Sequence, residues 1–126
     1  KPTVAIESTI LTHGLPYFYS KLLIEKAFDM LSKAYAANPN SYYILDSLAW
    51  AYYKKNDYVK AAELMEKVID MVPGEAISLD HLGDIYFAMN RKREAIYFWK
   101  QAKDLAEPED EISDKIIKKL EIYHAG

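Results

Sequence analysis

The chain contains no cysteine, and it has only four glycines and five prolines in 126 residues. The absence of cysteine excludes disulfide bonds, thiolate zinc sites, iron–sulfur clusters and a thiol nucleophile. The scarcity of glycine and proline disfavours a β-sandwich with its many turns and favours long helices. No apolar run approaches the roughly 20 residues that a membrane span needs, so no membrane span is expected.

An excess of positive charge is also missing. The chain has 16 Lys and Arg residues against 19 Asp and Glu residues, which gives a net charge of −3. Nucleic acid is therefore not an expected partner, because a phosphate backbone requires a basic surface.

What the chain does have is a period of 34 residues. Pro39 and Pro73 are separated by this distance, and residues 42–75 can be aligned with residues 76–109. The alignment superposes Leu45 on Leu79, Asp46 on Asp80, Leu48 on Leu82, Tyr52 on Tyr86, Asn56 on Asn90 and Ala61 on Ala95. A period of this length is typical of a repeat protein.

Each period is expected to contain two helices. Leu45, Leu48 and Tyr52 share one helix face, and a second apolar stripe begins at Ala61. The break between them, at residues 56–57, combines an Asn that tolerates the left-handed conformation with an Asp that can cap the next helix. The small residues expected where two helices approach closely are Ala49, Ala61, Gly83 and Ala95.

Together these residues resemble the tetratricopeptide repeat family. Residues 42–75 and 76–109 resemble two full repeats, and residues 22–41 resemble the second helix of a preceding one, so the resemblance covers about residues 22–109. The segments LDSLAWAYYKKNDYVKAAELMEKVI and DHLGDIYFAMNRKREAIYFWKQA are similar to the C-terminal repeats of alphaproteobacterial proteins of this family. Because the sequence has no cysteine and no visible secretory signal, we expect a cytoplasmic bacterial protein, or a periplasmic one if an upstream signal has been removed.

The predicted fold is an all-α solenoid of about two and a half repeats with a C-terminal capping helix. We divide the chain into an extended segment, residues 1–17, and a repeat domain, residues 18–126. The domain comprises a half repeat (18–41), two repeats (42–75 and 76–109) and the capping helix (110–126). The helix expected over residues 18–37 lacks the first helix of its own repeat. Phe18, Leu22 and Leu23 are then uncovered. Either residues 1–16 fold back over this face or over the concave groove, or two molecules cover each other, and we favour a homodimer.

The capping helix has an apolar stripe made of Ile112, Ile116, Leu120 and Tyr123. The opposite, polar face is assigned Glu111, Asp114, Lys115, Lys118 and Lys119. A helix lying on a membrane surface is the alternative, but the mixture of both charges favours a cap.

Residues 4–17, VAIESTILTHGLPY, resemble the N-terminal signature of the pseudouridine-5′-phosphate glycosidases. In that family the signature glutamate is an active-site residue, and Glu7 matches it, with His13 and Gly14 in the adjoining part. The family's catalytic lysine, metal-binding aspartate and α/β body have no counterpart downstream. The alternative function is therefore an inactive remnant or fusion of such a glycosidase with repeats, and we predict no enzyme activity, catalytic residue, metal or cofactor.

The leading prediction is a non-catalytic scaffold for protein–protein interactions. The resemblance implies that the first helix of each repeat lines a concave surface, which is aromatic and acidic here. The residues facing it are Tyr43, Asp46, Trp50, Tyr53, Ile77, Asp80, Asp84 and Phe87. Such a surface suits a basic or aromatic-rich peptide or partner and disfavours a terminal carboxylate.

Other interpretations of these residues remain open. They can form a solvated face, or the three aspartates can bind a hard cation through their oxygens. A general acid–base pair is disfavoured, because neither an apolar pocket nor a nucleophile accompanies the acids. His81 is interpreted as a packing residue.

Overall fold

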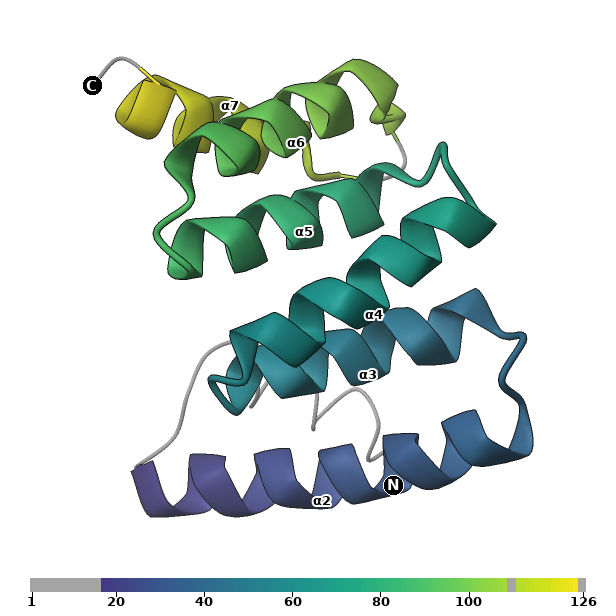
Figure 1. Cartoon of the computed structure of the whole chain (residues 1–126). Helices are drawn as coiled ribbons and strands as arrows, with labels where there is room; N and C mark the ends of the chain where they lie inside the picture. Colours follow the sequence, from purple (N-terminus) through teal and green to yellow (C-terminus); the bar gives the residue numbers. More distant parts are fainter. Residues whose placement is uncertain (1–16, 109–110, 125–126) are drawn as a thin grey trace.

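The computed structural model describes residues 17–108 and 111–124 and places six helices and no strand there (Figure 1). The helices are α2 (Tyr17–Ala37), α3 (Tyr42–Lys54), α4 (Tyr58–Met71), α5 (Ala76–Ala88), α6 (Lys92–Leu105) and α7 (Ser113–His124). The prediction of an all-α helical solenoid is confirmed. Among the described helices, none is both long and apolar enough to cross a membrane.

The helices pack as two hairpins with one further helix at each end of the stack. The most extensive packing joins α3 to α4 and α5 to α6, and the two hairpins meet where α4 packs on α5. At the ends, α2 packs on α3 and α7 packs on α6 (Figure 1). Every helix is therefore held by its neighbours in the chain, as in a solenoid.

The helix boundaries follow the local chemistry expected from the sequence. Asn56 and Asn90 adopt positive φ angles of 68° and 63°, directly after the turns that end α3 and α5. The side chain of Asp57 accepts a hydrogen bond of 3.4 Å from the backbone N–H of Lys60 and so caps α4. Ser41 caps α3 in the same way, at 3.3 Å. These caps satisfy N–H groups that have no partner within the helix.

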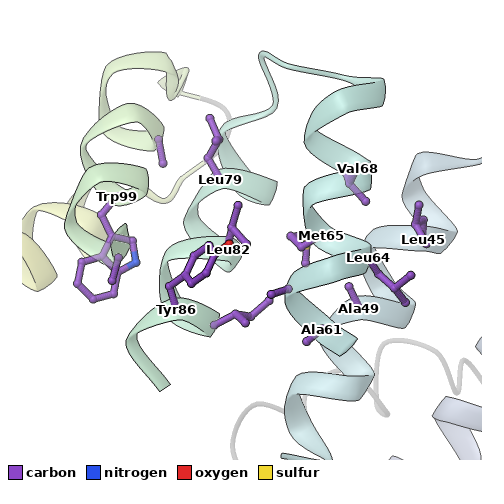
Figure 2. Close-up of a cluster of buried hydrophobic side chains, with 14 of the residues drawn as sticks. Leu45, Ala49, Ala61, Leu64, Met65, Val68, Leu79, Leu82, Tyr86 and Trp99 are labelled. Atoms are coloured by element: carbon purple, nitrogen blue, oxygen red, sulfur yellow. The ribbon is translucent and has the colours of Figure 1, made fainter. Parts of the chain in front are cut away.

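The apolar stripes of the two hairpins form one core (Figure 2). Leu45, Leu48, Leu79 and Leu82, which the period places at equivalent positions, are all buried. Ile116 of α7 is fully buried in the same cluster, so α7 covers the core as a capping helix does. It begins one residue after Ile112, which packs against the core from outside the helix.

The small residues lie at the close approaches between helices. Ala49, Ala61 and Ala95 have no exposed surface. At Gly83 a Cβ atom would lie 2.3 Å from Cδ1 of Trp99, which is far inside van der Waals contact. The absence of a side chain at residue 83 is what allows α5 and α6 to pack this closely.

We expect Gly83→Ala to destabilise the protein by about 1–3 kcal/mol, because the Trp99 ring must move out of its place in the core. This loss would exceed the gain in helix propensity that alanine normally brings. The matched control is Gly74→Ala, where a Cβ would meet no atom within 4 Å. Urea denaturation measures both variants, and equal stabilities would contradict the close-packing argument.

Candidate functional site

Acid–base contacts join α3, α5 and α7 across the stack. Asp46 of α3 lies 3.0 Å from Nδ1 of His81 on α5. On α5, the carboxylates of Asp80 and Asp84 lie 2.7 Å and 2.8 Å from Nζ of Lys119 on α7. We call the surface that carries these five side chains the α3–α5–α7 face.

Lys119 does not lie on the solvent side of α7, where the sequence analysis placed it. Its side chain is only 22% exposed and bridges both carboxylates of α5. The reason is helical geometry, since residue 119 is three positions after Ile116 and four before Tyr123. It therefore shares the inward stripe of these two residues, and its long side chain carries the charge to the acids.

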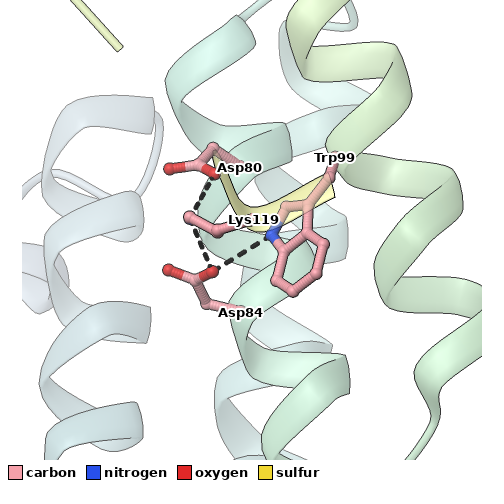
Figure 3. A network of polar contacts seen from close by, with 4 residues as sticks. All are labelled: Asp80, Asp84, Trp99 and Lys119. Atoms are coloured by element: carbon pink, nitrogen blue, oxygen red, sulfur yellow. Dashed lines mark hydrogen bonds and ion pairs between the residues drawn. The ribbon is translucent and has the colours of Figure 1, made fainter. Parts of the chain in front are cut away.

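Trp99 of α6 contacts both Asp84 and Lys119 (Figure 3). Its indole Nε1 donates a hydrogen bond of 3.0 Å to Asp84. The ammonium group of Lys119 lies 5.3 Å from the centre of the Trp99 ring, within the range of a cation–π contact. Asp80, Asp84, Trp99 and Lys119 are therefore one network, and we call it the Lys119 cluster.

The electrostatics of the Lys119 cluster are those of two acids that share one cation. Burial disfavours the charged form of Lys119, but the neighbouring Asp84 and Asp80 outweigh it and raise the pKa of Lys119. Burial raises the pKa of Asp84, and repulsion from Asp80 adds to this, against the opposing effects of Lys119 and Trp99. Lys119 and the two carboxylates therefore stabilise one another's charged forms against the cost of burial.

An aromatic group borders the Lys119 cluster. The ring of Trp50 stacks on Tyr53 at 4.4 Å between centroids and on His81 at 4.2 Å. Burial raises the pKa of Tyr53, and the negative charge of Asp84 contributes to the shift. Trp50 joins this aromatic group to the α3–α5–α7 face through His81, the partner of Asp46.

The remaining residues of the predicted surface lie in different surroundings. Phe87 packs on Tyr123 of α7, with ring centroids 4.5 Å apart. Tyr43 is 71% exposed and stacks on the neighbouring Tyr42, while Ile77 is half-buried near the start of α5.

The predicted acids are not free carboxylates, because each has a partner within the chain. Asp46 accepts hydrogen bonds from Ser78 and His81, and the other two acids bind Lys119. In the described part of the chain, no group of three or more His, Cys, Asp or Glu side chains is arranged to hold a metal ion. His81 packs against Trp50, as interpreted, but it also binds Asp46 and so belongs to the α3–α5–α7 face.

Sequence reasoning missed Lys119, although the repeat contains a signal for it. His81 follows its partner Asp46 by 35 residues, and Lys119 follows its partner Asp84 by the same 35 residues. In both cases the base lies two helices after the acid: His81 of α5 meets Asp46 of α3, and Lys119 of α7 meets Asp84 of α5. The same spacing also relates Asp80 to Lys115, which is exposed, so this signal alone does not identify Lys119.

Two comparisons with known proteins bear on this fold. Residues 45–74 match the family model described as "Tetratricopeptide repeat". The chain is therefore similar to a tetratricopeptide repeat over these residues. It is also 25% identical over 99 residues to prolyl 4-hydroxylase subunit alpha-1 from Gallus gallus, an alignment that covers 79% of this chain. The aligned part is 19% of that protein, so the chain spans about a fifth of this curated relative.

The glycosidase resemblance involves Glu7, His13 and Gly14, which lie outside the described residues. It stays a prediction, as do the division of the chain into residues 1–17 and 18–126, the alphaproteobacterial resemblance and the compartment. The match to a tetratricopeptide repeat favours an interaction module over an enzyme.

We expect Lys119→Met to lower the free energy of unfolding by about 1–3 kcal/mol, because it leaves two largely buried carboxylates without their cation. Lys118→Met is the matched control, since Lys118 is the exposed neighbour on the same helix and loses the same charge. Thermal unfolding of both variants measures the difference. Equal midpoints would show that the contacts of Lys119 contribute no stability.

Proposed function

We propose that this protein is a non-catalytic scaffold whose α3–α5–α7 face binds a segment of a partner protein, and that the segment carries basic side chains. The repeat itself supports an interaction role, because tetratricopeptide repeats form helical surfaces that contact other polypeptides. The chemistry of the face supports the choice of partner.

The observation that carries the proposal is the imbalance of charge on this face. Asp46, Asp80 and Asp84 contribute three carboxylates, and Lys119 is the lysine that pairs with two of them. His81, which pairs with Asp46, is charged only when it is protonated. A basic side chain of a partner would therefore gain attraction here, whereas an acidic one would be repelled.

The aromatic rings beside the acids support the same partner class. Trp50 and Tyr53 are partly exposed, and Trp50 stacks on His81, the partner of Asp46. Lys54 already places its ammonium group 5.7 Å from the Trp50 ring, so a cation is compatible with this surface. An arginine or lysine of a partner can combine a carboxylate contact with packing of its stem on a ring.

The curated relative agrees with a role in assembly. Its name describes a subunit, that is, a chain that works together with other polypeptides. Its activity is not transferred to this chain, which corresponds to only a fifth of its length.

The test is a binding titration with a fluorescein-labelled peptide of alternating lysine and glycine, followed by fluorescence anisotropy. We expect this peptide to bind more tightly than its glutamate–glycine counterpart. Replacing the three acids, in the variant Asp46→Asn/Asp80→Asn/Asp84→Asn, should weaken binding about tenfold or more, because each lost carboxylate removes a charge contact. The single variant Asp46→Asn provides a second measurement that leaves the Lys119 cluster intact.

The control variant is Glu63→Gln/Asp70→Asn/Asp104→Asn, which removes the same charge from exposed positions on α4 and α6. It should bind the lysine peptide nearly as well as the wild type, since exposed charges away from the site are screened by salt. If both triple variants lost the same affinity for the lysine peptide, the effect would depend only on net charge, and a site on the α3–α5–α7 face would be refuted.

Self-association through α2 is a further part of the proposal. Leu22 and Met30 on this helix are 48% and 58% exposed, which favours burial against a second molecule. We expect sedimentation equilibrium to show a dimer that the variant Leu22→Glu/Met30→Glu converts to a monomer. A monomeric wild type at high micromolar concentration would contradict this expectation.

A further inference from the structure

We propose that Lys119 is an internal competitor for the partner: its ammonium group occupies the carboxylate pair of Asp80 and Asp84 that a basic side chain of the partner would otherwise bind. The inference rests on the proposed function and deepens it, because it names the residue that sets the affinity of the face. It follows from the position of Lys119, not from the acids alone.

The contacts of Lys119 are those that a bound lysine side chain would make. Its Nζ lies 2.7 Å from Asp80 and 2.8 Å from Asp84, with the Trp99 ring at 5.3 Å (Figure 3). Two carboxylates and an aromatic ring satisfy an ammonium group from three directions. A partner's lysine that took this place would make the same contacts with Asp80 and Asp84.

Lys119 can also leave without unfolding the cap. The helix is anchored by Ile116, which is fully buried, and by Tyr123, whose ring packs on Phe87 and Trp99. The side chain of Lys119 keeps 22% of its surface exposed, so it is not fully enclosed by the helices around it. Rotation of this one side chain opens the carboxylate pair while α7 stays in place.

The cost of this rotation explains why Lys119 would tune affinity. When a binding site is filled by an internal group, the apparent affinity falls by the fraction of molecules in which the site is open. The exposed Lys118 on the same helix has the same charge but is not part of the Lys119 cluster. Comparing variants of Lys118 and Lys119 therefore distinguishes competition for the carboxylate pair from a general effect of removing a positive charge.

The first experiment compares affinities for the lysine–glycine peptide. Lys119→Met should bind it about tenfold more tightly than the wild type. Lys118→Met should change the affinity by less than about twofold, because its charge is exposed and screened. The gain should disappear when Lys119→Met is combined with Asp80→Asn/Asp84→Asn. Equal affinities for Lys119→Met and Lys118→Met would overturn the inference.

The second experiment uses the wild type and so does not depend on whether a variant folds. Acetylation by an N-hydroxysuccinimide ester, followed by mass spectrometry, reports how accessible each lysine is. We expect Lys119 to react slowly in the free protein and several times faster with the lysine–glycine peptide bound, relative to Lys118. Slower acetylation of Lys119 in the complex would mean that the peptide binds over it, and would overturn the inference.

The outcomes separate this inference from the proposed function. If neither the wild type nor Lys119→Met binds the peptide, the proposed function fails and the inference fails with it. If the wild type binds through the three acids but Lys119→Met gains nothing, only the inference is wrong.

Discussion

The packing of the Trp99 ring over Gly83 is the contact on which both the core and the candidate site depend. A Cβ at residue 83 would lie 2.3 Å from the ring, so α5 and α6 can pair in this way only with glycine there. The same indole donates a hydrogen bond to Asp84 and lies beside Lys119. One side chain thus determines the spacing of the second hairpin and positions an acid of the α3–α5–α7 face.

The acids of the α3–α5–α7 face already form contacts that join helices of the stack. Asp46 links α3 to α5 through His81, and the pair Asp80 and Asp84 links α5 to α7 through Lys119. These contacts help to hold successive helices in register, and they also lower the number of free carboxylates. A basic partner that binds as we propose would have to exchange these contacts, and this exchange would influence its affinity.

Most of the fold could be predicted from the sequence because its causes are local. The apolar spacing of Leu45, Leu48 and Tyr52 identifies a helix face, and Asn56 with Asp57 identifies the turn that follows. Such signals involve residues within one or two helical turns of each other. The acids on α5 could likewise be assigned to the surface of a first helix. Their partners could not, because charge alone suggested that every lysine of the last helix faces solvent.

The sequence by itself determined that this chain is a stack of helical hairpins with a period of 34 residues and an acidic, aromatic set of first-helix positions. Only the tertiary structure decided which charges meet. The acids and bases that meet are 35 to 39 residues apart in the chain, so their contact depends on the offset between successive hairpins. That offset results from how side chains of one hairpin pack against the next, where α4 meets α5 and α6 meets α7, and periodicity within a single helix contains no information about it.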